Sequence, residues 1–481
     1  LDRETQSRKD ALERVFKGSK ETMLISGQSG IGKSTLANTI KKTPIEGQPY
    51  IIYGKFDQLS QNVPFAALRK AFSELGRQIA ASGQDNVLFW QKELTQSVGK
   101  NGQALIDVMP ELEFIIGKQP EIPELPPADA QNRFNRTFLD FIHTFSKNKQ
   151  PLVIIIDDLQ WADEASLKSI ELIMNESAVN HLLFIGIHRN DALNPSHPLP
   201  LFINNLQTTE TSFTGILLQN LETPHINQLL SETLSCPPEE SQPLAALCFE
   251  KTHGNPFFVK QFLQSLHENN KISFNDNSGL WQWDIKGIRQ TEITGNVIEL
   301  MSERIHKLPE TTQFILQAAA CIGTRFDLLT VSQVMDRSME ETAGALEYAM
   351  SEGIILPTND STKFIKIIDQ ELESTDFSEI PEHLIPSYSF CQDRIQQAAY
   401  SLLPDTEALK IHRKIGRHYL AQTRERELPE RIFKIVNQLN LAVDIIAKPK
   451  ERSELAKLNL TAGQKAKNTS AFKLSLNYLK V

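Results

Sequence analysis

Short apolar runs alternate with amphipathic stretches of helical period along the first 220 residues of the chain. This alternation is typical of a parallel β-sheet whose strands are joined by helices that cover both of its faces. The runs that predict strands are residues 22–26, 50–53, 152–157, 181–187 and 215–219. We therefore expect an α/β core built on a five-stranded parallel sheet.

A long helical stretch separates the second and third of these strands, and it contains prolines at positions 120, 123, 126 and 127. Proline has no backbone N–H to donate, and its ring clashes with the preceding turn of a helix. We therefore expect this proline-spaced segment to be a surface loop.

Beyond residue 220 the strand pattern gives way to helices. Residues 224–267 have helical periodicity throughout. The segments 272–274 and 280–284 flank an Asn-Asp-Asn-Ser-Gly turn, which predicts a β-hairpin. The sheet domain has therefore ended before this point.

Residues 296–353 predict about four short helices, and strands follow at 354–356 and 388–390. Helices followed by a two-stranded wing are the order found in a winged helix. Between the two strands lies an insert with six carboxylates and no basic residue among them: Asp369, Glu371, Glu373, Asp376, Glu379 and Glu382. Such a run predicts a solvated loop.

After Pro404 the chain is helical to its end, and small and large apolar residues alternate over 455–479 as in paired, TPR-like repeat helices. The expected parts are an α/β domain over 1–220, a helical lid with a β-hairpin over 221–290, a winged-helix domain over 291–402 and the start of a helical repeat region over 403–481.

Composition removes several classes of protein. The longest apolar runs have five or six residues, whereas a membrane-spanning helix needs about 20. The four cysteines form no CxxC pair, which disfavours a zinc site or a disulfide framework and fits a reducing cytoplasm. With 50 basic against 59 acidic side chains and a net charge of -9, binding to nucleic acid is not expected.

Because the chain opens at Leu1 and stops inside a helical pattern, we expect it to be a segment of a longer protein.

A glycine-rich loop joins the first strand to a helical segment. It consists of Gly27, Gln28, Ser29, Gly30, Ile31, Gly32, Lys33, Ser34 and Thr35. This is the phosphate-binding pattern in the strand, loop and helix context that it requires. Backbone N–H groups and the helix N-terminus attract phosphate, Lys33 reaches the β- and γ-oxygens, and Ser34 can bind Mg²⁺. ATP or ADP with Mg²⁺ is the ligand that we expect here.

Two carboxylates, Asp157 and Asp158, end the apolar third strand. Desolvated carboxylates without a partner cost free energy, so a nearby cation would explain them. Asp157 is expected to hold Mg²⁺ through water, and Asp158 to orient and activate the attacking water. The alternative is that the two acids simply open a surface loop.

His188 and Arg189 follow the fourth strand, which we expect to lie beside the strand that carries the acid pair. Arg189 is placed to sense or stabilise the γ-phosphate, because a fixed planar cation suits that charge. An ordinary surface arginine is the alternative, and His188 is interpreted as structural.

Together with the glycine-rich loop, three further motifs make the chain resemble the AAA-type ATPase module of signal-transduction ATPases with numerous domains (STAND). They are Asp157-Asp-Leu-Gln-Trp161-Ala-Asp163, His188-Arg189 and Lys251-Thr-His-Gly254-Asn-Pro256-Phe-Phe258. Three more motifs resemble the central region of large bacterial proteins that fuse a serine/threonine kinase, such an ATPase, helical repeats and a sensor histidine kinase: Gly54-Lys-Phe-Asp-Gln58, Gln131-Asn-Arg-Phe134 and Asp393-Arg-Ile-Gln-Gln-Ala-Ala-Tyr400.

The resemblance implies further contacts to nucleotide. Pro256 would pack against the adenine, although it can equally serve to start a helix. The opening Leu1-Asp-Arg3-Glu4 would lie along the adenine, with Asp2 where the family usually has glycine. Gln392 stands where the resemblance implies a histidine that touches the β-phosphate in the closed, ADP-bound form.

The function expected from these residues is an ATP-binding, slowly hydrolysing regulatory switch. Its partners would be the neighbouring kinase and sensor domains of the same polypeptide, and a nucleotide-dependent oligomer is left open. One alternative is a nucleotide-bound scaffold that does not hydrolyse ATP, and retention of Asp158 speaks against it. A second is a DNA-binding regulator, yet residues 313–322 contain no Lys or Arg that would mark a recognition helix.

The glutamine at position 392 generates a prediction. Gln392→His should tighten ADP binding several-fold, and more at pH 6 than at pH 8, because only imidazolium adds a charge-assisted hydrogen bond to the phosphate. Calorimetric titrations of both proteins at both pH values measure this. Identical affinities throughout would mean that position 392 does not face the phosphates.

Overall fold

The computed structural model describes residues 2–42, 49–57, 63–190, 197–209, 211–276, 278–289, 297–359, 361, 384–469 and 471–481. The acidic insert from Asp369 to Glu382 lies outside these ranges. The chain divides into two compact units. The first unit comprises Leu1–Phe56 and Pro64–Ile293, and the second comprises Asp57–Val63 and Thr294–Val481.

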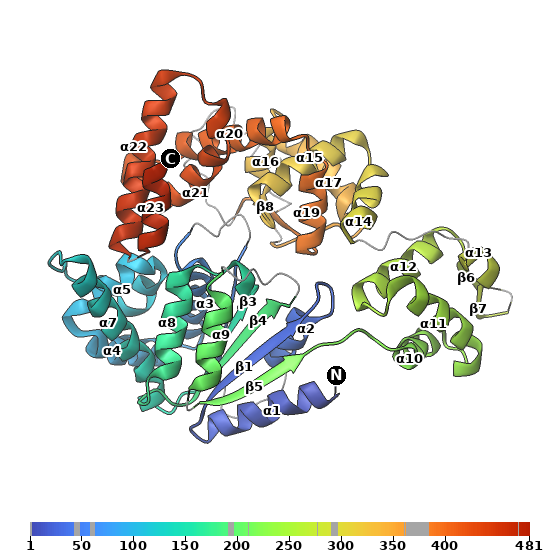
Figure 1. Cartoon of the computed structure of the whole chain (residues 1–481), viewed down its shortest axis with the longest axis horizontal. Helices are drawn as coiled ribbons and strands as arrows, with labels where there is room; N and C mark the ends of the chain where they lie inside the picture. The colour runs from blue at the N-terminus through green and yellow to red at the C-terminus, as the bar shows by residue number, and fades with distance from the viewer. Residues whose placement is uncertain are drawn as a thin grey trace. The chain divides into compact units, whose positions relative to one another are not determined.

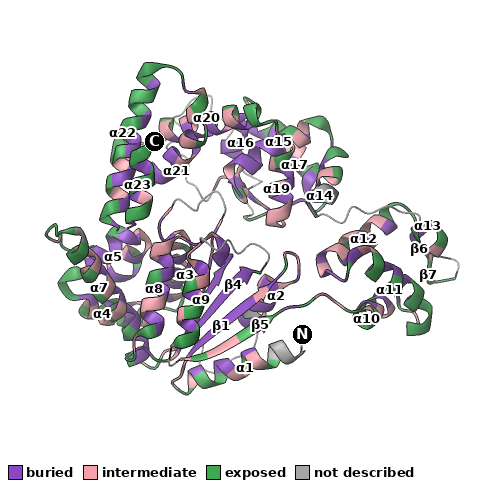
Figure 2. Cartoon of the chain, in the orientation of Figure 1, coloured by how far each residue is buried: buried purple, intermediate pink, exposed green. Residues whose placement is uncertain are grey.

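A five-stranded parallel sheet forms the centre of the first unit (Figure 1). Its strands lie in the order β2-β3-β4-β1-β5. Their bounds are β1 Lys20–Gly27, β2 Tyr50–Lys55, β3 Leu152–Asp157, β4 Leu182–Arg189 and β5 Ser212–Leu217. Every residue of β3 and β4 is buried, as the purple centre of Figure 2 shows, which explains why both read as continuous apolar runs.

Helices cover both faces of this sheet, and the faces follow the two-residue period of the strands. Ile154 and Ile156 of β3 pack into one core with helix α3 and with α7, which is rich in phenylalanine. Val153 and Ile155 point to the opposite core, where α1 and α2 pack. The helices are α1 Asp2–Phe16, α2 Lys33–Asn38, α3 Ala66–Ala81, α4 Gln84–Val98, α5 Gly102–Val108, α6 Glu113–Ile116, α7 Pro127–Lys147, α8 Glu164–Asn175 and α9 Leu199–Thr208.

All five expected strands are present, and β3 has the expected bounds, whereas the ends of the other four differ from the sequence pattern. β5 spans 212–217 rather than 215–219, because its limits are set by pairing of Ser212 with Glu21 and of Leu217 with Ser26 on β1. As an edge strand it is half exposed and gives no continuous apolar run. Of the clustered prolines, those at 120, 123 and 126 lie outside helices and strands as expected. The fourth begins α7, where a missing N–H costs nothing.

A helical segment, called the lid below, follows β5 in the first unit. It comprises α10 Thr223–Leu234, α11 Pro238–Thr252, α12 Pro256–Glu268, the antiparallel hairpin of β6 Ile272–Asn275 and β7 Leu280–Trp283, and α13 Ile285–Arg289. The hairpin lies where the sequence predicts it. A core of its own, made largely of leucine and phenylalanine from the three long helices, holds the lid together.

The second unit begins with short helices and a small antiparallel sheet. The elements are α14 Val297–His306, α15 Glu310–Ile322, β8 Arg325–Asp327, α16 Leu328–Val334, α17 Met339–Ser351, β9 Ile355–Pro357, β10 Ser387–Phe390 and α19 Asp393–Ser401. The expectation of a two-stranded wing is wrong in the number of strands, because β8 adds to the edge of β10 and the sheet order is β8-β10-β9. A strand of three residues with one buried side chain is too short to show a period.

Helices complete the second unit. They are α20 Asp405–Ala421, α21 Leu428–Leu441, α22 Pro449–Asn468 and α23 Phe472–Lys480, and each packs against the next one along the chain. Close packing requires glycine at one crossing, because a Cβ on Gly463 of α22 would lie 2.8 Å from the Leu479 side chain of α23. Short 3-10 turns occur at Thr39–Lys42, Gly99–Asn101, Pro110–Leu112, Leu159–Trp161, Glu425–Glu427 and Val443–Ile445. Within the described ranges no helix combines the length and apolar character needed to cross a bilayer.

An ion cluster joins α20 to α22 in the second unit. The Glu451 carboxylate, 8% exposed, accepts hydrogen bonds from Arg413 Nε at 2.9 Å and Nη2 at 2.6 Å. Arg417 Nε donates to the same carboxylate at 3.1 Å. The hydrogen bonds from Arg413, and then those from Arg417, lower the pKa of Glu451 to about 2. Two cations thus share one carboxylate at this crossing.

Glu451→Gln should lower the free energy of unfolding at pH 7 by roughly 1 to 3 kcal/mol, since charge-assisted hydrogen bonds are lost. In the unfolded chain a Glu has a pKa near ~4.3, so the carboxylate stabilises the fold above that pH. This contribution is lost as the pH falls from about 5 toward the folded pKa of about 2. Urea titrations of both proteins between pH 7 and pH 3.5 should therefore show the difference shrinking. Glu454→Gln is the control, because Glu454 is exposed and pairs with Arg417 alone among the ion pairs of the described residues. An equal loss in both variants would contradict the prediction.

Candidate functional site

The glycine-rich loop lies between the end of β1 and the start of α2. Gly30 and Gly32 have φ values of 81° and 101°, a left-handed backbone that favours glycine. The side chain of Ile31, 6% exposed, anchors the loop in the core beneath the sheet. Lys33 Nζ donates to the carbonyl oxygens of Gly27 at 2.9 Å and Gln28 at 2.7 Å. The loop thus closes around its own lysine, whose ammonium points toward the place where phosphates would bind.

Asp157, at the end of β3, lies directly beside the start of α2. Ser34 Oγ donates to its Oδ2 at 2.7 Å, and Tyr53 OH donates to the same oxygen at 2.8 Å. Burial, and next the charge of Asp158, raise the pKa of Asp157. A cation at this place would compensate the buried carboxylate. The two residues expected to hold Mg²⁺, Ser34 and Asp157, are therefore in contact, and their oxygens suit that metal.

Asp158 is the next residue, and both of its carboxylate oxygens are engaged. Gln160 Nε2 donates to Oδ1 at 2.6 Å, and Lys55 Nζ lies 3.2 Å from Oδ2. Arg189 Nε lies 3.9 Å from Oδ1. The backbone of Asp158 is left-handed, with φ 57° and ψ 46°, a conformation that Asp and Asn adopt more readily than most residues. This acid does not simply open a surface loop, because it is 6% exposed and held by two cations and an amide.

Arg189 ends β4, which pairs with β3 as the sequence predicts. It is 5% exposed, so it is not an ordinary surface arginine. Its backbone N–H donates to Gln160 Oε1 at 3.0 Å. One buried amide side chain therefore connects the ends of β3 and β4. The neighbouring His188 is also buried, its Nδ1 lies 3.1 Å from the Arg189 carbonyl oxygen, and burial lowers its pKa, so a neutral, structural imidazole is favoured.

Three sequence-predicted residues are not brought to this place by the described contacts. The side chain of Arg3 lies outside the described residues. Pro256 is the first residue of α12 in the lid. Gln392 precedes α19 in the second unit, where its side chain caps no backbone N–H of that helix. The roles of these three residues stay predictions.

Sequence reasoning missed three groups that contact the acid pair: Tyr53, Lys55 and Gln160. Tyr53 and Lys55 are two apart on β2, so they share a face of the strand, and β2 pairs with β3 in parallel. Lys55 pairs in register with Asp157. The sequence offered a signal for Tyr53 and Lys55, because these polar side chains stand two residues apart at the end of the otherwise apolar strand β2. The signal for Gln160 was its place inside the motif that begins at Asp157.

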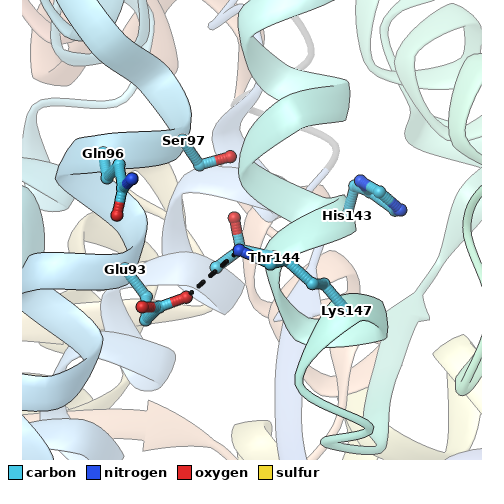
Figure 3. Close-up of a pocket in the computed structure, with 6 residues that line it drawn as sticks. All are labelled: Glu93, Gln96, Ser97, His143, Thr144 and Lys147. Carbon is cyan, nitrogen blue, oxygen red and sulfur yellow. Dashed lines mark ion pairs between the residues drawn. The ribbon is translucent and has the colours of Figure 1, made fainter.

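A second hollow of about 240 Å³ lies between α4 and α7. Figure 3 shows its lining, with Glu93, Gln96 and Ser97 on one helix and His143, Thr144 and Lys147 on the other. Lys147 Nζ and Glu93 Oε2 form an ion pair at 3.6 Å, drawn as the dashed line. None of these residues comes from a strand end or from the glycine-rich loop. The candidate site therefore remains the loop and the acid pair.

Comparison with a family model supports this choice. Residues 2–185 match the model described as the AAA ATPase domain. This segment includes the glycine-rich loop and both carboxylates of the acid pair, whereas Arg189 and the lid follow it along the chain.

Curated relatives are signalling kinases. The chain is 29% identical to "Hybrid signal transduction histidine kinase G" of Dictyostelium discoideum, over 98% of this chain and 16% of that protein. It is 22% identical to "Peroxide stress-activated histidine kinase mak3" of Schizosaccharomyces pombe, over 70% of this chain and 16% of that protein. The chain therefore spans 16% of the length of each of these relatives.

Solved structures with a similar backbone path have TM-scores below 0.5. One is a Signal Transduction ATPase with Numerous Domains (STAND) protein with a tetratricopeptide repeat sensor from Pyrococcus horikoshii, with a TM-score of 0.43, 14% identity and coverage of 98% of this chain and 57% of that one. Another is the ORC1 protein of Aeropyrum pernix in complex with DNA, with a TM-score of 0.33, 12% identity and coverage of 85% and 94%.

Proposed function

We propose that the chain binds ATP or ADP with Mg²⁺ at the glycine-rich loop and hydrolyses ATP slowly, because residues 2–185 match the model of the AAA ATPase domain. The observation that carries this proposal is the contact of Ser34 Oγ with Asp157 Oδ2 at 2.7 Å. It joins the helix that follows a phosphate-binding loop to the acid that ends the buried strand β3, which β4 separates from β1 in the sheet. A metal-nucleotide site requires this juxtaposition of phosphate cradle and carboxylate.

Each residue of the site has a distinct part in the proposed reaction. Lys33 neutralises charge on the β- and γ-phosphates, and Ser34 with Asp157 holds Mg²⁺, which would supply electrostatic stabilisation of the phosphate oxygens. Asp158 orients the attacking water and accepts its proton. Arg189, fixed by Gln160 through its backbone N–H, offers a positive charge to the γ-phosphate.

The hydrogen bonds of Asp158 support slow turnover. Its two oxygens are already engaged, one by Gln160 Nε2 and one by Lys55 Nζ, so both groups compete with a water molecule for the carboxylate. Loss of the Lys55 contact would make Oδ2 more available to the attacking water. A γ-phosphate near the lysine would favour that change, because it offers another anion to the same ammonium.

The scaffold and DNA-binding alternatives are less well supported. A scaffold that only binds nucleotide has no use for a buried second acid with three polar partners. For a DNA-binding regulator, the helix before the wing would enter the groove, yet α17 carries Glu340, Glu341 and Glu347 and no Lys or Arg. Such a helix repels the phosphate backbone.

We further propose that the ATP and ADP states set the arrangement of domains in a larger signalling protein. The support is the similarity to one hybrid histidine kinase along 98% of this chain, which spans 16% of the length of that kinase. Its partners would then be kinase and sensor domains of the same polypeptide, and nucleotide-dependent oligomers are a related proposal.

Lys33→Ala should abolish binding of labelled ATP, because the loop loses the cation that faces the phosphates. Lys168→Ala is the matched control, since Lys168 is 72% exposed and pairs only with Glu164 in the ion pairs described. Filter binding or calorimetry measures both variants. Unchanged affinity of Lys33→Ala would remove the nucleotide from this loop.

Asp158→Asn should retain ATP binding while turnover falls by about 10² to 10³-fold, because the amide cannot accept the proton of the attacking water. Asn also tolerates the left-handed backbone at this position, so the fold should be kept. Phosphate release and ATP affinity are measured in parallel. A loss of binding equal to the loss of turnover would instead assign Asp158 to holding the metal or the fold.

A further inference from the structure

The turn that enters α12 of the lid is fixed against the chain that leaves β5. Leu221 N donates to the Gly254 carbonyl oxygen at 2.8 Å, and Asn220 Nδ2 donates to that of His253 at 2.9 Å. Gly254 has a φ of 74°, and a Cβ there would lie 1.9 Å from the Leu221 carbonyl oxygen. Only glycine fits this approach, so the turn has little freedom relative to the end of the sheet.

Asn255 follows this turn and is 5% exposed. Its side-chain amide makes two contacts in opposite directions. Oδ1 accepts from the Phe257 N–H at 3.1 Å, which caps α12. Nδ2 donates to the Ser29 carbonyl oxygen of the glycine-rich loop at 3.0 Å. The cap alone requires only an acceptor, so the donated hydrogen bond is an additional property of asparagine.

The contact fixes the orientation of one peptide in the loop. A peptide bond is planar and trans, so the Ser29 carbonyl and the Gly30 N–H point in opposite directions. When Asn255 holds the carbonyl from the lid side, the Gly30 N–H is directed away from the lid. The approach is close, because a Cβ on Gly30 would lie 2.8 Å from Phe257 Cβ and 2.9 Å from Asn255 Oδ1.

We propose that Asn255 is a positioning residue through which the lid orients the Ser29–Gly30 peptide for phosphate. This inference rests on the proposed binding of nucleotide at the loop. With the lid in place the Gly30 N–H is preorganised as a donor to phosphate, and when the lid moves away the peptide is free to rotate. Phosphate affinity and lid position are then coupled by one hydrogen bond, and the coupling acts in both directions.

Two substitutions separate this role from helix capping. Asn255→Ser and Asn255→Asp both keep a good cap for α12. The serine hydroxyl is too short to replace the Nδ2 contact, and the carboxylate has no proton to donate to the Ser29 carbonyl. Both variants should bind ADP about 5- to 20-fold more weakly, the scale of one lost hydrogen bond with its partner left unpaired. Their affinity for adenosine, which has no phosphate, should equal that of the parent.

Asn227→Ser is the matched control. Asn227 Nδ2 donates to the Pro238 carbonyl oxygen at 3.0 Å within the lid, and the described contacts of Asn227 do not involve the loop. The affinity of the Asn227→Ser variant for ADP should equal that of the parent.

Calorimetry of the complete chain decides between the outcomes. Parent affinity for ADP in both Asn255 variants overturns the inference, while the proposed function stands. An equal loss for ADP and adenosine also overturns it, because Asn255 would then act on the fold of the site and not on the phosphate. Failure of the parent itself to bind ADP would overturn the proposed function, and the inference with it.

Discussion

The buried acid pair at the end of β3 is the constraint on which the rest of the site depends. Asp157 and Asp158 are 1% and 6% exposed, and two adjacent carboxylates taken out of water are tolerated only with partners that return the lost solvation. Those partners come from three other parts of the chain: Ser34 after β1, Tyr53 and Lys55 on β2, and Arg189 at the end of β4. Because the sheet is parallel and its order is β2-β3-β4-β1-β5, all of these strands end at the same edge.

The two carboxylates have different partners, and this difference divides their roles. Asp157 accepts hydrogen bonds from two neutral hydroxyls and from the Asp158 backbone N–H, and the nearby Lys55 offsets part of its charge, so a metal ion would add to this compensation. Asp158 faces two ammonium or guanidinium groups and an amide, so its charge is already compensated within the protein. Asp157 is therefore suited to hold a cation, and Asp158 is suited to respond to a change in the cations around it. Gln160 adds rigidity, because its single amide bonds both the Asp158 carboxylate and the Arg189 backbone.

The lid is connected to this site through backbone as well as side chains. Gly254 pairs with Leu221 just beyond the sheet, and Asn255 contacts the Ser29 carbonyl of the phosphate-binding loop. A loop that needs glycine for its own turn also needs it to accept the lid at close range, as the short Cβ distance at Gly30 demonstrates. Small residues in this loop thus allow both the backbone turn that would bind phosphate and the close approach of the neighbouring helix.

The sequence by itself determined the local features. The glycine-rich loop, the acid pair and the strand before each are contiguous, and their chemistry is readable because the strand-loop-helix context and the buried strand each lie within about ten residues. The two fully buried strands β3 and β4 were equally clear, since burial on both faces leaves a continuous apolar run. The edge strand β5 and the three-residue β8 were misplaced or missed, because half-exposed or very short strands take their limits from their pairing partners.

Only the tertiary structure decided which distant side chains meet the acid pair and the loop. Lys55 and Asp158 are about one hundred residues apart in the sequence, and Asn255 and Ser29 more than two hundred. No period or motif links positions so far apart. Their contacts follow from strand order and from the path of the lid, which are set by the packing of whole elements and the loss of water from their faces.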